Sequence, residues 1–197
     1  MAPGMGVSPD GMEAGVPGKM FSTHGTPTTR TYKYATFWID HYFKFVYVTL
    51  HESKRSDELM QSKLDFEEFA SRYCVNISSI RADNGAYTAR MFEDDCRKKN
   101  QRLTFCAVGA HWQNGVAERF IGTLVTQAHT ILLHAMTKWP QVVNESMWPF
   151  ALRYMVNFHN ASILCTKQAT PFSLFTGEDP PYTWQSLLCS CQTSSWR

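Results

Sequence analysis

The sequence predicts an α/β fold with a mixed sheet of five strands flanked by helices. Three observations support this prediction: an aromatic and β-branched hairpin near the start of the chain, helices and strands that alternate through its middle, and further helices towards its end. A chain of 197 residues with 44% hydrophobic residues is long enough for one domain with a substantial core.

The expected strands are separated by turn-forming residues. Residues 1–30 are rich in Gly, Pro and Thr and are expected to form a loop-rich segment that contains one short strand. Pro9 removes a hydrogen-bond donor from that strand, so we expect the strand to be frayed there. The next two strands form a hairpin around residues 41–44. The five expected strands cover residues 7–10, 34–39, 45–50, 76–82 and 102–108.

The expected helices are marked by capping residues and by apolar residues at helical spacing. Ser56 is expected to be the N-cap of the first helix, because Asp57 and Glu58 follow it in a favourable first turn. The clearest helix covers residues 115–136, with apolar residues at 116, 120, 124, 128, 131 and 135. The other helices are expected from Ser56 to Tyr73 and over residues 89–100, 146–159 and 171–175.

Composition restricts the class of protein. The net charge of +2 neither indicates nor excludes a nucleic-acid partner, because a local basic patch suffices for binding. No stretch approaches the roughly 18 apolar residues of a membrane helix and no signal peptide is evident, so we expect an intracellular protein without a membrane partner. The six cysteines show neither zinc-ligand spacing nor a disulfide framework and are expected to be reduced: Cys74, Cys96, Cys106, Cys165, Cys189 and Cys191.

Three short stretches each carry one carboxylate that is a candidate for chemistry. Asp10 lies in the first expected strand, Asp83 follows the fourth, and Glu118 lies in the first turn of the clearest helix. Carboxylates from two strands and a helix can hold two hard divalent cations, which prefer oxygen ligands. Such ions stabilise the attacking and leaving oxygens of a phosphodiester displacement, so the pattern indicates cutting or joining of nucleic-acid strands.

Each motif also has a purely structural interpretation. Asp83-Asn84-Gly85 is first of all a turn signal, and a glutamate in a first helical turn, such as Glu118, is favoured by the helix dipole. The end of an apolar strand is nevertheless where α/β proteins place their sites. Asp83 and Glu118 lie 35 positions apart, and this spacing with these flanking residues favours a functional pair.

Three motifs together resemble the integrase core of Copia-type (Pseudoviridae-like) LTR retrotransposons, which is related to retroviral integrases. They are Asp83-Asn84-Gly85, residues 114–119 (Asn-Gly-Val-Ala-Glu-Arg) and residues 171–177 (Pro-Phe-Ser-Leu-Phe-Thr-Gly). The resemblance covers about residues 7–181, and residues 182–197 form a divergent tail. It implies a ribonuclease-H-like fold with a DDE set of carboxylates, in a fragment of a longer polyprotein.

The resemblance also implies roles for particular residues. Asp10, Asp83 and Glu118 would be the catalytic residues and the ligands of two Mg²⁺ or Mn²⁺ ions. Asp40, at the end of the second expected strand, is the alternative first carboxylate. The family, however, places its metal-binding aspartate on the preceding strand, in a context similar to that of Asp10. The expected DNA contacts are Gln113, Asn114, Arg119 and Lys138.

Two positions depart from the family pattern. The family usually has arginines where this chain has Gly122 and His129, which share a helix edge with Glu118 and are expected to face DNA. The expected function is 3′ end processing and strand transfer of retrotransposon DNA, by a homo-oligomer that acts in the nucleus on element ends and target DNA. Two alternatives remain open: a catalytically decayed relic with weak nucleic-acid binding, and a stand-alone ribonuclease or resolvase of the same fold.

Overall fold

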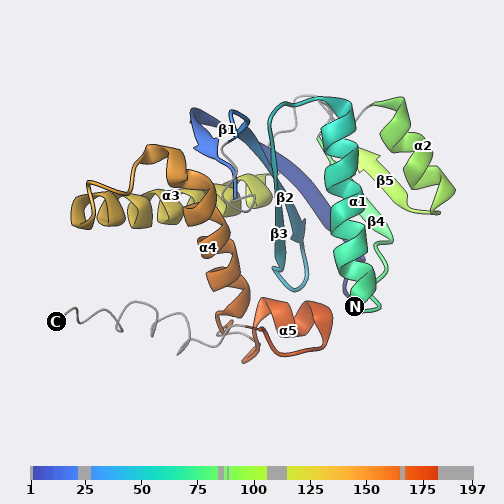
Figure 1. Ribbon diagram of the computed structural model, residues 1–197. Coiled ribbons are helices and arrows are strands. Elements are labelled where there is room, and N and C mark those ends of the chain that lie inside the picture. The colour runs from blue at the N-terminus through green and yellow to red at the C-terminus, as the bar shows by residue number, and fades with distance from the viewer. Residues whose placement is uncertain are drawn as a thin grey trace.

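A five-stranded sheet with helices on both faces forms the centre of the molecule (Figure 1). The structure is a computed structural model that describes residues 2–21, 28–83, 87, 89–105, 115–164 and 167–181. The spatial order of the strands is β3-β2-β1-β4-β5. Their bounds are Val7–Lys19 for β1, Thr31–Asp40 for β2, Val46–His51 for β3, Ser79–Ala82 for β4 and Arg102–Phe105 for β5.

The sheet is mixed. Strands β1, β2 and β3 form an antiparallel meander, whereas β4 and β5 run parallel to β1. The two parallel connections pass through helices, as the alternation of helical and strand patterns in the sequence predicts. The predicted fold class, a ribonuclease-H-like α/β fold with five strands, is confirmed by this topology.

The helices divide between the two faces of the sheet. In Figure 1, α1 and α2 lie to the right of β2 and β3, and α3 and α4 lie to their left. The helices cover Ser56–Arg72 for α1, Arg90–Lys98 for α2, Gly115–Lys138 for α3, Trp148–Ala161 for α4 and Pro171–Thr176 for α5, with a short 3₁₀ helix at Glu145–Met147 before α4.

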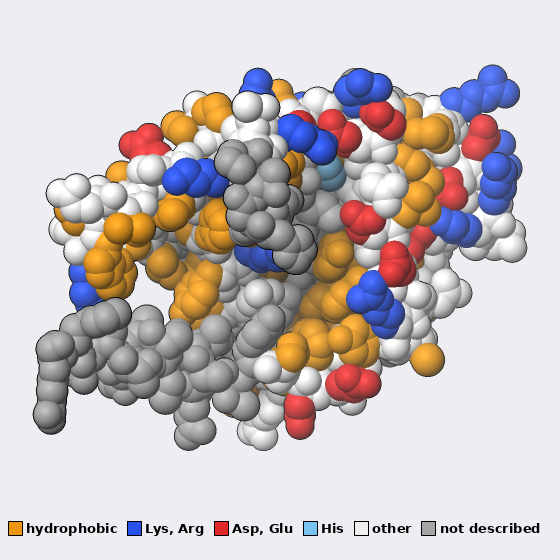
Figure 2. Space-filling model, in the orientation of Figure 1, with side chains coloured by type: hydrophobic (Ala, Val, Ile, Leu, Met, Phe, Trp, Pro, Cys, Tyr) orange, Lys and Arg blue, Asp and Glu red, His pale blue; other side chains and the backbone are white. Residues whose placement is uncertain are grey.

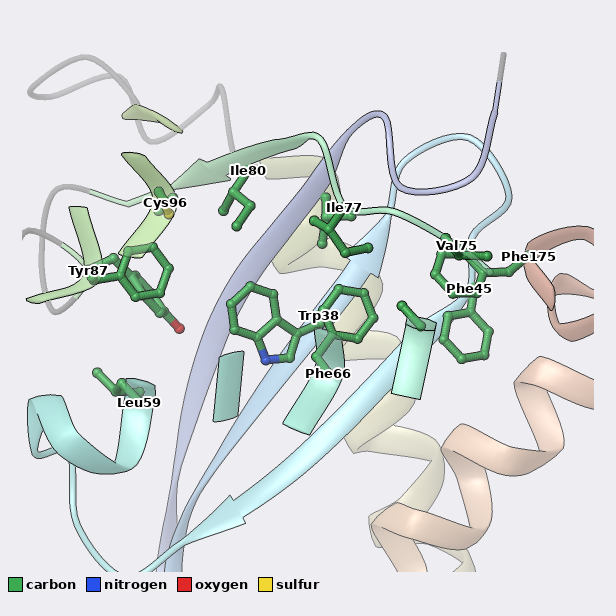
Figure 3. Close-up of a cluster of buried hydrophobic side chains, with 14 of the residues drawn as sticks. Trp38, Phe45, Leu59, Phe66, Val75, Ile77, Ile80, Tyr87, Cys96 and Phe175 are labelled. Carbon is green, nitrogen blue, oxygen red and sulfur yellow. The ribbon is translucent and has the colours of Figure 1, made fainter. Parts of the chain in front are cut away.

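Each face of the sheet has its own hydrophobic cluster. Trp38, Phe66 and Ile80 are fully buried between the sheet and α1, in the cluster drawn in Figure 3. Phe37, directly before Trp38 in the chain, is buried on the opposite face with residues of α3 and α4. Alternating side chains of β2 therefore supply both cores, as expected for a strand that is buried on both faces.

Strand β1 differs from its prediction in length and in order. It continues for 13 residues, to Lys19, and the expected fraying at Pro9 is wrong. The carbonyl of Gly6 accepts a hydrogen bond from the backbone N–H of His41, so the backbone N–H and C=O groups of even-numbered residues in this part of β1 point towards β2. Those of the odd-numbered residues point towards β4. The missing donor of Pro9 therefore falls on the β4 side, where the recorded pairing is Val7 with Ile80.

Two helix predictions also need correction. The N-cap of α1 is Arg55, which is extended and makes no side-chain cap bond, and Ser56 is already helical. In α3 the predicted apolar stripe is shifted, because Ile131 is exposed and Phe120 is half-buried. The buried positions follow the face that packs on the sheet and α4, and they are Ala117, Ile121, Leu124, Ala128 and Leu132.

The remaining predictions concern cysteines and membranes. Cys74 and Cys96 have free thiols; the other four cysteines lie outside the described residues, as do residues 182–197. Among the described helices, none combines the length and the apolar character needed to cross a bilayer.

Candidate carboxylate site

Asp10 and Asp83 reach the same level on two neighbouring strands. Val7 pairs with Ile80 in the parallel β1–β4 ladder, and each aspartate lies three residues beyond its member of that pair. Neighbouring strands are about 4.8 Å apart, so this register brings the two carboxylates side by side. The position of Asp83 directly after β4, which the sequence predicted, is confirmed.

Glu118 approaches the pair from the α3 face. Asp10 is the partner of Phe37, and paired residues point to the same face of a sheet. Phe37 packs in the cluster that contains Ala117 of α3, directly before Glu118 in the chain. The first turn of α3 thus lies over this part of the sheet, with the exposed Glu118 at its edge.

The three carboxylates interact electrostatically. Burial raises the pKa of the Asp10 carboxyl, a hydrogen bond from the Gly11 N–H at 2.8 Å opposes that rise, and the negative charges of Glu118 and Asp83 add to it. In an otherwise uncompensated site, like charges disfavour the ionised form. A bound cation would remove that penalty, so the donor set suits a divalent metal ion.

The geometry of a closed metal site is nevertheless not present. Within the described part of the chain, no three His, Cys, Asp or Glu side chains lie close enough together to hold a metal ion. Asp10, Asp83 and Glu118 therefore match the chemistry of magnesium ligands, but they do not form a finished coordination cluster.

Asp40 has a different task. Its carboxylate is fully buried and accepts hydrogen bonds from the backbone N–H groups of Gly4, Tyr42 and Phe43, at 3.1, 3.0 and 2.7 Å. It pairs with Val7, three residues before Asp10 in the register, and so lies about 10 Å along the sheet from the carboxylates. Asp40 closes the turn between β2 and β3, which favours Asp10 as the first carboxylate.

Tyr87 lies on the α1 side of the sheet, and its hydroxyl is within electrostatic range of the site, which the sequence did not reveal. Burial raises the pKa of its hydroxyl; a hydrogen bond with Thr36 opposes the rise, and the charges of Asp10 and Asp83 add to it. Figure 3 shows the Tyr87 ring in the α1-side cluster with its hydroxyl towards the sheet. A tyrosine four residues after Asp83 looks like an ordinary core aromatic in the sequence, so only the fold shows that its hydroxyl lies near the two aspartates.

A buried chain of polar groups continues from Tyr87 into the protein. Thr36 Oγ1 lies 3.1 Å from His51 Nε2, which lies 3.1 Å from Thr49 Oγ1. Thr49 in turn bonds to Ser62, which accepts a hydrogen bond from Trp38 Nε1 at 2.8 Å. Satisfied buried networks of this kind fix side-chain positions, so the network holds the Tyr87 hydroxyl behind the carboxylates.

The expected DNA contacts have different outcomes. Gln113 and Asn114 lie outside the described residues. Arg119 is exposed in the first turn of α3, next to Glu118. Lys138, at the other end of α3, is about 30 Å from Glu118 at 1.5 Å per residue, so it is not part of the carboxylate site.

Comparison with known proteins finds one curated relative and many solved structures, whereas no family model matches the chain. The relative is the "Retrovirus-related Pol polyprotein from transposon TNT 1-94" of Nicotiana tabacum. It is 30% identical over 130 residues, which are 64% of this chain and 9% of that polyprotein. The chain therefore spans about a tenth of the length of the relative it matches.

Two of the solved structures that match come from retroviral integrase studies. The catalytic core domain of HTLV-2 integrase, solved in complex with magnesium in a trimeric form, has a TM-score of 0.61 at 15% identity and covers 89% of this chain and 98% of its own. An integrase chain in the simian T-cell lymphotropic virus intasome, in complex with PP2A regulatory subunit B56 gamma, has a TM-score of 0.63 at 21% identity and covers 92% of this chain and 58% of its own.

The sequence and the fold point to the same group of proteins. The curated relative is a retrovirus-related polyprotein of a transposon, and the two solved structures named above are an integrase catalytic core domain and a chain of an intasome. Together they confirm the resemblance drawn from the motifs: the chain is similar to the integrase catalytic core of an LTR retrotransposon.

Proposed function

We propose that this chain is the catalytic core of a Copia-type retrotransposon integrase, which processes the 3′ ends of the element's DNA and joins them to target DNA. The observation that carries the proposal is the register that puts Asp10 and Asp83 side by side, within electrostatic reach of Glu118. Two carboxylates on neighbouring strands with a third on a helix are suited to phosphodiester chemistry that needs divalent cations.

Asp10, Asp83 and Glu118 would hold two Mg²⁺ or Mn²⁺ ions. Bound ions of this kind lower the pKa of an attacking water or hydroxyl and stabilise the leaving oxygen. The protein's own groups position the DNA and fix the carboxylates: Gly11 donates to Asp10, and Tyr87 lies behind Asp10 and Asp83. No side chain of the chain needs to act as a covalent nucleophile.

The test is a disintegration assay, the reverse of strand transfer, on a branched DNA substrate with Mn²⁺ or Mg²⁺. Asp10→Asn, Asp83→Asn and Glu118→Gln should each lose more than about a hundredfold in rate, because even the outer partners of metal ligands cost 10–100-fold. Glu13→Gln is the matched control, since Glu13 lies on β1 but is exposed and paired with Lys54. Equal rates in all four variants would refute the site.

The second candidate is a decayed relic that binds nucleic acid without catalysis. Gly122, at a position where the family usually has an arginine, favours it. The same assay separates the two, because a relic would show no metal-dependent product with wild-type protein. Cleavage of an RNA–DNA hybrid in preference to branched DNA would instead indicate a ribonuclease.

We further propose that the active form is a homo-oligomer that works in the nucleus on element ends and target DNA. Sedimentation velocity in the presence and absence of a branched DNA substrate tests the first part, and a fluorescent fusion in host cells tests the second. A monomer that carries out disintegration at the full rate would contradict the oligomer.

A further inference from the structure

The described arginines fall into two groups. Members of the first group form ion pairs with described carboxylates, and they are Arg30, Arg55, Arg72, Arg90 and Arg97. In the part of the chain that the structure describes, the second group has no such ion pair and is exposed: Arg81, Arg102, Arg119 and Arg153. Arg153 lies over the Phe21 ring and Arg119 is on α3, which leaves Arg81 and Arg102 on the sheet itself. Exposed arginines without a carboxylate partner leave all guanidinium donors available to an anion.

Arg81 and Arg102 lie on the same face of the sheet as the carboxylates. Arg81 comes directly after Ile80, which is buried on the α1 side, so its side chain belongs to the opposite face. Arg102 pairs with Ser79, two residues before Arg81 on the same side of β4. Arg81 and Arg102 are therefore diagonal neighbours on β4 and the edge strand β5, on the α3 face of the sheet.

The turn between β2 and β3 adds further positive charge. Lys44 Nζ donates to the carbonyl of His41 at 2.8 Å, and Lys167 Nζ donates to the carbonyl of Tyr42. His41 is held by a 2.7 Å hydrogen bond to the buried Ser8. An ammonium has three donors, so each lysine keeps two for another ligand.

The positive groups are separate from the carboxylates. In the parallel register Arg81 lies at the level of Ser8, whose Oγ is 2.7 Å from His41 Nε2, so Arg81 lies on the turn side of Asp10. In the β1 register, Asp10 lies two residues beyond the level of Arg81 and four beyond that of His41, which is about 7 and 13 Å at 3.3 Å per residue. That length matches about four nucleotides of a DNA strand, at 3.4 Å each.

We propose that Arg81, Arg102 and Lys44 form a phosphate-binding track that holds the DNA backbone beside the phosphodiester at Asp10 and Asp83. The proposal rests on the proposed function. The arginines would bind the phosphates next to the reacting one, and the reacting phosphodiester would lie at the carboxylates. The separation along one face places the cationic side chains and the carboxylates at different points of a DNA strand. Planar guanidinium groups match phosphate oxygens in pairs, which suits them to this task.

The salt dependence of DNA binding tests the track. The probe is a short, fluorescently labelled, blunt-ended DNA duplex, titrated with protein at a series of KCl concentrations. The slope of log affinity against log salt should become shallower by about 1.8 in Arg81→Ala/Arg102→Ala, at about 0.9 per lost phosphate contact. The matched control is Arg72→Ala/Arg90→Ala, which removes the same charge from α1 and α2 and should keep the wild-type slope.

Two outcomes overturn the track: equal slopes for the two double variants, or no binding of the duplex by the wild-type protein. Arg81→Gln/Arg102→Gln repeats the test with longer polar side chains if the alanine variant melts early. A second measurement locates the contact. Each phosphate near the reacting one is replaced in turn by a neutral methylphosphonate, and binding of the modified duplex is measured. The replacement should weaken binding by wild type at one or two positions and leave binding by the double variant unchanged there.

The track and the proposed function fail in different ways. Asp83→Asn should bind the duplex with the wild-type slope in EDTA while it loses disintegration. If disintegration depends on Asp83 but the slopes do not depend on Arg81 and Arg102, the track is wrong and the function stands. If the slopes change but wild-type protein forms no metal-dependent product, the track stands and the catalytic function is wrong.

Discussion

The two faces of the sheet treat charge in opposite ways. On the α1 side, the fully buried Lys63 lies 2.6 Å from both Glu67 and Asp95, and Lys99 bonds to the same two carboxylates at 2.7 and 2.9 Å. Figure 2 shows side chains of both signs interspersed on the right of the molecule, where α1 and α2 lie. On the α3 side, the negative charges of Glu118 and Asp83 act on the partly buried Asp10.

The two faces therefore have different roles. On the α1 side, opposite charges at contact distance satisfy one another, so removing one of them leaves a partner uncompensated. Like charges on the α3 side cost stability, which is the usual property of a site that a ligand completes. Substitutions that break one face should leave the other intact, and the predictions below follow from that separation.

The largest loss of stability should follow removal of the lysine at the centre of the ion cluster. Lys63→Met leaves Glu67 and Asp95 half-buried with one fewer positive partner, so we expect it to cost about 3 kcal/mol. Urea denaturation measures this cost. The control, Arg72→Met, breaks an exposed pair with Glu68 and should change little. A Lys63→Met protein as stable as wild type would show that the cluster does not hold α2 on α1.

On the carboxylate face, removal of a charged group should raise the stability of the protein. Burial, then repulsion by Glu118 and Asp83, raises the pKa of Asp10, so the folded state binds this proton more tightly than the unfolded state. Stability from this group is present at low pH and is lost as pH rises through the raised pKa. We therefore expect Asp10→Asn to melt at a higher temperature than wild type in EDTA at pH 7, by a margin that shrinks towards pH 4.

Mg²⁺ should reverse that order. A ligand stabilises only the state that binds it, so Mg²⁺ should raise the melting temperature of wild type and not of Asp10→Asn. Glu13→Gln, three residues along β1, serves as the control and should respond to Mg²⁺ like wild type. Equal responses of Asp10→Asn and wild type to Mg²⁺ would exclude Asp10 as a ligand.

A smaller effect is expected at Tyr87, which links the two faces. Tyr87→Phe removes the hydroxyl near Asp10 and Asp83 and one partner of Thr36, so we expect about 1 kcal/mol of lost stability. The Mg²⁺ concentration that gives half-maximal disintegration should rise about tenfold. That is the lower limit of the roughly 10–100-fold effect expected for groups that orient metal ligands. Thr49→Val, farther along the same network, should lower stability without that change in the Mg²⁺ midpoint. Parallel effects of the two variants would show that Tyr87 has only a structural role.

The sequence predicted the order of strands and helices because each has a clear pattern. The aromatic and β-branched residues of β2, the apolar fourth strand and the apolar residues at helical spacing are local signals. The length of β1 was missed because Pro9 and three glycines within it are typical of a loop. Whether the missing donor of Pro9 breaks a pairing depends on which neighbouring strand it faces, and the sequence of β1 alone does not show that. Tyr87 and Arg81 were missed for a related reason: their positions relative to the carboxylates come from register and face, which no single segment carries.

The smallest effect is expected on the edge of α3. Gly122 and His129 are exposed, and a Cβ at Gly122 would meet nothing within 4 Å, so larger side chains fit there. Gly122→Ala should add about 1 kcal/mol of helix stability. Gly122→Arg with His129→Arg should add similar stability and also steepen the salt dependence of DNA binding by up to about 0.9 per new phosphate contact. Gly122→Ala thus separates stability from affinity. If the double arginine variant keeps the wild-type slope, this edge does not contact DNA, and the DNA path runs instead along Arg81 and Arg102.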